Sequence, residues 1–196
     1  MVKRLFDIIA SLIGIIILSP FFILISILVV VDSRGGIFYK QVRVGKGLRE
    51  FKLLKFRTMY SNSDEKGLLT VGMKDSRITR IGYYLRKYKL DELPQLLNVL
   101  IGDMSVVGPR PEVPKYVAIY TDEQKKVFVI KPGITDYASI EYANENEILA
   151  KATNPEEEYI NNIMPAKLKL NMKYISEMSL RTDIGIIFRT ISKLFL

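Results

Sequence analysis

The feature that most constrains the fold of this chain is a nearly unbroken apolar run from Leu5 to Val31. Its interruptions are Asp7 and a few small residues, among them Ser11 and Ser19. As a helix rising about 1.5 Å per residue, the run would be roughly 40 Å long, which exceeds the apolar core of a bilayer, about 30 Å thick. A secretory signal peptide is not expected, because its apolar core has only about 7–15 residues. The run therefore predicts a helix inserted in a membrane.

Pro20 lies near the middle of this run, directly after Ser19. A proline inside a helix removes one backbone hydrogen bond and clashes with the preceding turn, so a kink is expected there. The Ser19 hydroxyl can bond a carbonyl that the proline leaves free, which makes the interruption tolerable in lipid. We therefore expect a helix, a break at Ser19-Pro20 and a second helix.

Basic residues flank the run on both sides. Lys3 and Arg4 precede it, and the residues that follow it include Arg34, Lys40, Arg43 and Lys46. Because Lys and Arg favour the cytoplasmic side of a membrane, the two ends compete for the same side. A re-entrant segment that enters and leaves one leaflet satisfies both ends, and Asp7 is then expected to pair with Lys3 or Arg4. Hydropathy alone leaves a single transmembrane anchor as the alternative.

The Ser33-Arg34-Gly35-Gly36 turn marks the end of the apolar segment. It predicts a membrane segment over residues 1–33 and a second domain over residues 34–196. Ile37–Val44 and Glu50–Phe56 are predicted to be two strands of a hairpin. The outward positions of this hairpin form a basic ribbon of Lys40, Arg43, Lys52, Lys55 and Arg57. The ribbon is either a solvated face or a contact for anionic membrane lipids or substrate.

The rest of the chain is predicted to be mostly helical. Apolar spacing indicates a helix over Ile78–Lys89 and a short helix over Asp91–Leu100, with Pro94 in its first turn, whereas Tyr60–Thr70 is expected to be a polar loop. Glu141–Glu158 is acidic, with a helix beginning near Asn154-Pro155, and is either a solvated surface or a segment that reads substrate.

The C-terminal residues predict an amphipathic helix. Its apolar positions are Ile184, Ile187, Phe188, Ile191, Leu194 and Phe195. The helix either packs on the core or lies in the membrane interface. The predicted fold is thus α+β: an N-terminal re-entrant helix-break-helix, then a small, mostly helical domain with a β-hairpin and interfacial amphipathic helices.

The composition limits the chemistry that the chain can perform. It has no His and no Cys, which excludes imidazole bases, thiolate nucleophiles and ordinary zinc sites. Its 29 basic and 21 acidic residues give a net charge of +8, which favours an anionic partner. Nucleic acid explains this charge but not the apolar run, and no recognition motif for it is present. No pattern in the sequence indicates an oligomeric state.

Asp91 and Glu92 are adjacent carboxylates at the start of a predicted helix. Such a pair most often only caps a helix, for under about 1 kcal/mol. Here Arg86 lies five residues upstream, and Arg110 stands between Pro109 and Pro111. A carboxylate that attacks a phosphoryl group needs both negative charges offset, and Mg²⁺ with one or two Arg side chains supplies that. The arrangement indicates magnesium and phosphate chemistry.

A series of motifs in a fixed order resembles the bacterial sugar transferases, in the form of a small monotopic phosphoglycosyl transferase. The motifs that carry the resemblance are Lys3-Arg4-Leu5-Phe6-Asp7, Ser19-Pro20, Tyr39–Gly45, Lys55-Phe56-Arg57-Thr58-Met59, Leu90–Leu96, Gly102-Asp103-Met104-Ser105, Val107–Pro111 and Lys131-Pro132-Gly133-Ile134-Thr135. They span residues 3 to about 135. Such enzymes initiate glycoconjugate assembly.

The resemblance implies transfer of a phosphosugar from a UDP-sugar to polyprenol phosphate at the cytoplasmic face of the bacterial inner membrane. UMP is released and a polyprenol-diphosphate sugar remains. By this resemblance, Asp91 is the nucleophile that forms a covalent phosphosugar intermediate, and Glu92 helps to position Mg²⁺ or assists catalysis. Arg86 and Arg110, with Pro109 and Pro111 around the latter, match positions that contact phosphate and nucleotide. Ser19-Pro20 matches the break of a re-entrant helix.

Two other functions are compatible with the residues alone. One is a membrane-tethered, non-catalytic module that binds nucleotide or anionic lipid, and the other is an aspartyl-phosphate hydrolase. The chain also departs from the pattern of its relatives after Thr135, where it continues Asp136-Tyr137-Ala138-Ser139. This departure makes the segment from Asp136 to Glu158 a candidate for recognising the sugar of the substrate.

Overall fold

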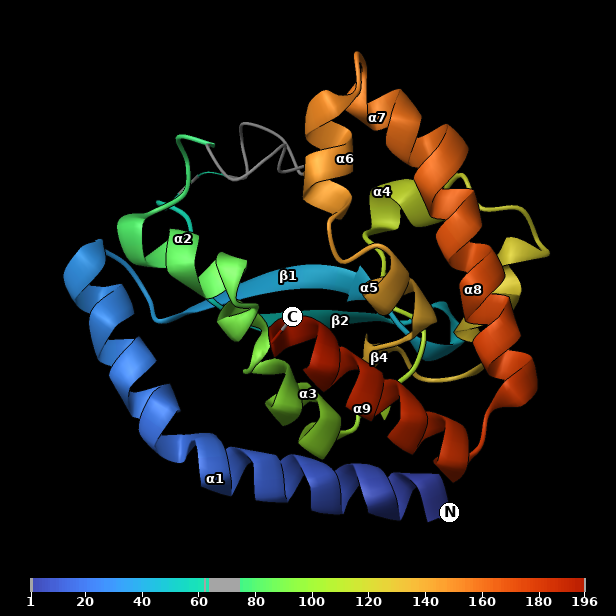
Figure 1. The fold of residues 1–196 in the computed structure, drawn as a ribbon, viewed down its shortest axis with the longest axis horizontal. Coiled ribbons are helices and arrows are strands. Elements are labelled where there is room, and N and C mark those ends of the chain that lie inside the picture. Colours follow the sequence, from blue (N-terminus) through green and yellow to red (C-terminus); the bar gives the residue numbers. More distant parts are fainter. Residues whose placement is uncertain (1, 62, 64–74, 196) are drawn as a thin grey trace.

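The computed structural model describes residues 2–61, 63 and 75–195 (Figure 1). Most of the predicted loop Tyr60–Thr70 therefore lies outside the described residues. The elements before the candidate site are α1 (Val2–Asp32), β1 (Phe38–Val44), a 3-10 turn η1 (Lys46–Leu48), β2 (Glu50–Phe56) and α2 (Arg80–Lys87). Those that form the site and follow it are η3 (Leu90–Glu92), α3 (Gln95–Ile101), β3 (Ser105–Val107), α4 (Pro114–Val117), η4 (Gln124–Val129), β4 (Gly133–Thr135), α5 (Tyr137–Glu141), α6 (Glu145–Lys151), α7 (Pro155–Glu158), η5 (Tyr159–Ile163), α8 (Met164–Glu177) and α9 (Leu180–Phe195).

Helix α1 runs without interruption from Val2 to Asp32 and bends in mid-course (Figure 1). The Ser19 hydroxyl donates to the Ile16 carbonyl at 2.8 Å, and this is the carbonyl that Pro20, lacking an N–H, leaves free. The predicted role of Ser19 is confirmed. The break expected at Ser19-Pro20 is a bend within one continuous helix, because the hydroxyl replaces the missing bond.

The apolar surface of α1 is mostly uncovered. In its most apolar 18-residue window only 11% of the residues are buried, and it is long and apolar enough to cross a membrane. The core helix of a soluble protein would instead be covered. This exposure supports membrane insertion, while the re-entrant course of α1 stays a prediction.

The N-terminal end of α1 is bound to the rest of the protein by its basic residues. Lys3 pairs with the buried Asp183 of α9 at 2.6 Å. The Arg4 guanidinium donates to the carbonyls of Val99 and Leu100, at 2.6 and 2.9 Å. Because these carbonyls lie at the C-terminal end of α3, Arg4 caps that helix.

Asp7 pairs with neither Lys3 nor Arg4, contrary to the prediction. Its buried carboxylate accepts hydrogen bonds from the Ser105 hydroxyl at 2.9 Å and from the Val106 N–H at 3.0 Å. Both basic residues have other partners, as described above, and β3 supplies donors to the carboxylate directly. Asp7 therefore joins α1 to β3.

The C-terminal end of α1 is held by Arg57, which follows β2. Its buried guanidinium donates to the carbonyls of Ser33 and Gly36, at 2.8 and 2.6 Å, and to the Ser33 hydroxyl at 2.6 Å. Asp32 also accepts a hydrogen bond from the Ile81 N–H of α2 at 3.0 Å. Both ends of α1 are thus bound to the same body, although a straight 31-residue helix would separate them by roughly 45 Å.

The predicted hairpin is confirmed. Strands β1 and β2 are antiparallel, with Phe38 opposite Phe56 and Val44 opposite Glu50. A second small sheet pairs β3 and β4 in parallel. In the basic ribbon only Lys40 and Lys52 are exposed, whereas the other three side chains are at least half-buried and bound to protein groups. The ribbon is therefore not one uniform solvated or lipid-binding face.

The helices after the hairpin cover it and pack against one another (Figure 1). Asn154 caps α7 by accepting from the Glu157 N–H at 3.3 Å, as the sequence predicts. The predicted C-terminal helix is confirmed as α9. Of its predicted apolar positions, Ile184, Phe188 and Ile191 are 45%, 67% and 48% exposed, whereas Ile186, outside that set, is buried. The inner face of α9 packs on the core, and an interfacial position for its outer face stays a prediction.

The turn at residues 33–36 lies between α1 and β1, while a division into two domains there stays a prediction.

Gly82 allows α2 to lie directly on the chain after β2. A Cβ at this position would stand 2.1 Å from the Thr58 carbonyl oxygen, a backbone atom that cannot swing away. We expect Gly82→Ala to lower the free energy of unfolding by about 1–3 kcal/mol, as overpacking does. Thermal unfolding of the protein in nanodiscs measures this loss.

Gly185 in α9 is the matched control, because a Cβ there meets nothing within 4 Å. Gly185→Ala should be neutral or stabilising by up to about 1 kcal/mol, since alanine favours a helix. Equal unfolding temperatures for the two variants would contradict this account of how α2 is positioned.

Candidate active site

Asp91 and Glu92 belong to the 3-10 turn η3, between α2 and α3. The predicted helix over Asp91–Leu100 is therefore shorter than expected, because α3 begins only at Gln95, after Pro94. Lys89, with a positive φ of 57°, turns the chain out of α2 and into η3. The carboxylates thus lie on a short turn between two helices.

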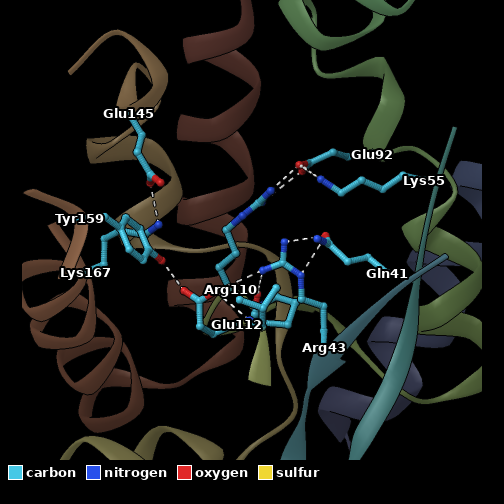
Figure 2. A network of polar contacts seen from close by, with 11 residues as sticks. Gln41, Arg43, Lys55, Glu92, Arg110, Glu112, Glu145, Tyr159 and Lys167 are labelled. Carbon is cyan, nitrogen blue, oxygen red and sulfur yellow. Dashed lines mark hydrogen bonds and ion pairs between the residues drawn. The ribbon is translucent and has the colours of Figure 1, made fainter. Parts of the chain in front are cut away.

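Glu92 is neutralised by two cations from distant parts of the chain (Figure 2). Lys55 of β2 pairs with it at 2.9 Å. The Arg110 guanidinium forms a two-pronged ion pair with both carboxylate oxygens, one prong at 3.1 Å. Burial by itself raises the pKa of Glu92, but Arg110 and Lys55 outweigh it and hold this pKa well below the ordinary value. Glu92 is therefore ionised and fully engaged.

Asp91 is 6% exposed and its environment differs from that of its neighbour. Within the described part of the chain, no group donates a hydrogen bond to its carboxylate or pairs with it within 4 Å. Burial raises the pKa of Asp91, and the nearby Lys55 opposes this rise. Its carboxylate lines a cleft and is available to react with a bound molecule.

The cleft is large, with a volume of about 1280 Å³. Residues from α1, the hairpin, η3, α5, α8 and α9 line it. Arg86 of α2 stands at its wall, where burial lowers the pKa of the guanidinium and Asp91 opposes that effect. A cleft of this size accommodates a ligand larger than an ordinary metabolite.

The predicted residues Arg86, Arg110 and Pro111 line the cleft together with Asp91 and Glu92. Pro109 supports the turn from behind, since its carbonyl accepts from the Gly133 N–H at 3.0 Å. The Pro111 carbonyl accepts from Arg43 at 3.0 Å. The phosphate- and nucleotide-binding roles of these residues stay predictions. Ser19 and Pro20 belong to the bend of α1.

Sequence reasoning missed the network that holds the Pro109-Arg110-Pro111 turn (Figure 2). Glu112, the next residue, pairs with Arg43 of β1 at 3.3 Å and accepts a hydrogen bond from the Tyr159 hydroxyl. Arg43 also donates to Gln41 at 2.7 Å. Only the adjacency of Glu112 to the turn could have indicated this role, because Tyr159 comes 47 positions later.

The acidic residues near the cleft suit a magnesium ion with few protein ligands. No group of three or more acidic side chains placed to hold a metal occurs among the residues that the structure describes. Mg²⁺ usually keeps several waters and binds one or two carboxylates together with substrate phosphates. Asp91 is free for this purpose, whereas Glu92 would have to share an oxygen with Arg110 or Lys55.

The whole chain, residues 1–196, matches the sequence profile described as bacterial sugar transferase. It is 36% identical over 193 residues to the UDP-N-acetylgalactosamine-undecaprenyl-phosphate N-acetylgalactosaminephosphotransferase of Aeromonas hydrophila. It is 35% identical over 203 residues to the UDP-glucose:undecaprenyl-phosphate glucose-1-phosphate transferase of Klebsiella pneumoniae. These alignments cover 97% and 99% of the chain, but only 43% and 40% of the two relatives.

A shorter relative matches over nearly its full length. This is the exopolysaccharide production protein PSS of Rhizobium leguminosarum bv. phaseoli, 36% identical over 197 residues, which cover 96% of the chain and 92% of the relative. The matches confirm the resemblance carried by the motifs between Lys3 and Thr135. The chain belongs to the bacterial sugar transferase family.

Proposed function

We propose that the protein transfers a phosphosugar from a UDP-sugar to polyprenol phosphate, giving a polyprenol-diphosphate sugar and UMP. The names of two relatives support this reading, since both state transfer of a sugar phosphate to undecaprenyl phosphate. The observation that carries the proposal is the contrast between the two carboxylates. Glu92 is neutralised by Arg110 and Lys55, while Asp91 is buried, lines the cleft and has no ion-pair or hydrogen-bond partner among residues 2–61, 63 and 75–195.

In the first step, an Asp91 carboxylate oxygen attacks the sugar-bearing phosphorus of the UDP-sugar. A bond forms between this oxygen and the phosphorus. The bond from that phosphorus to the bridging oxygen of the uridine-bearing phosphate breaks, and UMP leaves with that oxygen. Lys55 and Arg86 offset the charge that gathers on the phosphates. The sugar phosphate remains on Asp91 as a mixed anhydride.

In the second step, a phosphate oxygen of the polyprenol attacks the same phosphorus and expels the Asp91 carboxylate. A carboxylate is both a nucleophile and a good leaving group, so neither step requires an imidazole. The insertion of α1 in the membrane keeps the cleft at the height of the lipid phosphate, which brings the reacting groups together. The enzyme is then free for another cycle.

Mg²⁺ is part of the proposal. Asp91 and Glu92 would hold it, and the ion would supply positive charge to the phosphates of the substrate. Arg110 and Lys55 fix the Glu92 side chain in place, so this ligand is oriented before substrate arrives.

The proposed location is the cytoplasmic face of the bacterial inner membrane, with α1 as a re-entrant, monotopic anchor. The support is that both ends of α1 are bound to the same body, through Lys3 and Asp183 at one end and through Arg57 and Ser33 at the other. A straight spanning helix would break one of these sets of bonds.

Replacing Asp91 by Asn tests the proposed nucleophile. An amide cannot form the mixed anhydride, so we expect UMP release from a UDP-sugar with Mg²⁺ and polyprenol phosphate to fall by at least about 10³-fold. Asp122→Asn is the matched control and should keep wild-type turnover, because this side chain is fully exposed. Wild-type turnover by Asp91→Asn would indicate a non-catalytic module or another nucleophile, and free phosphate without a lipid product would indicate a hydrolase.

Single cysteines test the topology, since the natural chain has no Cys. We expect Val2→Cys and Lys151→Cys both to resist a membrane-impermeant maleimide in intact spheroplasts and to react after permeabilisation. Adding Pro20→Leu should straighten α1 and expose Val2→Cys to the reagent outside. Labelling of Val2→Cys in intact cells without the Pro20 change would overturn the re-entrant topology.

A further inference from the structure

The cleft has a second polar wall that the proposed chemistry at Asp91 does not use. We call it the α5–α8 wall, and its residues are Ser139, Tyr142, Glu145, Lys167 and Asn171. Figure 2 shows Glu145 and Lys167 on the opposite side of Arg110 from Glu92 and Lys55. A molecule with its phosphates near Asp91 would extend toward this wall.

Two buried polar atoms on this wall have no hydrogen-bond partner. In the described part of the chain, the unpartnered atoms are Gln95 Nε2, Ser139 Oγ and Asn171 Oδ1, and only the latter two residues line the cleft. Asn171 is 5% exposed. A buried polar group without a partner is unfavourable, so a residue that lines a cleft and carries such an atom is a candidate for completing its bonds with a ligand.

Asn98 is a buried asparagine of the same protein whose side-chain amide is hydrogen-bonded to the backbone. It is 1% exposed, and its amide accepts from the Leu54 N–H and donates to the Lys52 carbonyl, both at 2.9 Å. Asn98 therefore bonds two neighbouring strand groups, whereas the Asn171 oxygen bonds none of the described residues. The two buried asparagines therefore differ in how far the protein satisfies their side-chain amides.

The charges on the wall cancel locally. Lys167 pairs with Glu145 at 2.6 Å and stands 5.4 Å from the Tyr159 ring centre. A phosphate would be drawn instead to the other side of the cleft, where the three cations Arg86, Lys55 and Arg110 outnumber the two carboxylates of Asp91 and Glu92. A hydroxyl group both donates and accepts hydrogen bonds. A ligand rich in hydroxyl groups can therefore bond the Ser139 hydroxyl, the Asn171 amide and the Lys167–Glu145 ion pair of this wall.

We propose that the α5–α8 wall binds the sugar ring of the donor, with Asn171 and Ser139 as residues that select the sugar through its hydroxyl or amide substituents. This inference rests on the proposed function and names the part of the substrate that each side of the cleft contacts.

Asn171→Leu tests the assignment with a side chain of similar size. For the UDP-sugar that the wild-type enzyme prefers, we expect kcat/KM to fall about tenfold, the effect of one hydrogen bond between uncharged groups. For a UDP-sugar that differs at the recognised substituent, kcat/KM should change little, so the preference collapses toward unity. Inhibition by UMP should be unchanged. Ser139→Ala should give a smaller change of the same kind.

Stability separates recognition from a structural role. Asn171→Leu should not lower the unfolding temperature, because no bond to the protein is lost, whereas Asn98→Leu should lower it. Asn162→Leu is the activity control, since the exposed side chain of Asn162 donates to Glu158 at 2.8 Å and does not line the cleft as the described residues form it. It should keep the wild-type preference among sugars.

Three results would overturn the proposal. One is that Asn171→Leu lowers kcat/KM equally for every UDP-sugar and also weakens inhibition by UMP, which would place the nucleoside at this wall. Another is that Asn171→Leu keeps the preference among UDP-sugars but lowers the unfolding temperature. Asn171 would then only bind water in the small cavity of about 10 Å³ beside it. The third is a wild-type enzyme without preference. In each case UMP release still depends on Asp91, so the proposed function would stand.

Discussion

The ion pairs of Glu92 are the interaction on which the candidate site depends. This carboxylate joins three segments: η3, which carries it, β2 through Lys55, and the Pro109-Arg110-Pro111 turn through Arg110. Because two cations satisfy Glu92, the adjacent Asp91 has no close partner among the residues that the structure describes, in a cleft lined by more basic than acidic side chains. Removing either cation would leave the buried Glu92 with one ion pair in place of two, which weakens the compensation of its charge.

The attachment of α1 at both ends gives the membrane segment a structural role in the site. Arg4 caps α3, the helix that follows η3, and Arg57 ends the strand segment that carries Lys55. The same residues that fix α1 thus fix the elements around Asp91. A change in the course of α1 would therefore shift α3 and β2, and with them the carboxylates of Asp91 and Glu92.

Short-range patterns in the sequence predicted the hairpin, α2, α7 and α9 well, because alternation, helical spacing and capping residues are local signals. The apolar run predicted the long helix, and Ser19-Pro20 predicted a break where the structure has a bend within one continuous helix. The sequence also placed Asp91, Glu92, Arg86 and Arg110 at one site, although the resemblance carried much of that prediction. These residues do line one cleft.

What the sequence could not predict were the partners of charged residues across long separations. Asp7 was expected to pair within its own helix, yet its donors come from residues 105 and 106. Lys55 and Arg57 were predicted to lie on a basic ribbon that is either solvated or in contact with lipid or substrate, but Lys55 binds Glu92 and Arg57 caps α1. The start of α3 at Gln95 was missed because Pro94 was taken to lie inside the helix, whereas it precedes it.

The central claim is that Asp91 carries the sugar phosphate between the two steps. Intact-protein mass spectrometry after mixing the enzyme with a UDP-sugar and Mg²⁺, without polyprenol phosphate, tests it most directly. The account predicts one added sugar phosphate per chain, located on the peptide that contains Asp91 and removed when polyprenol phosphate is added. An unmodified chain that still forms UMP and lipid product at the wild-type rate would contradict it.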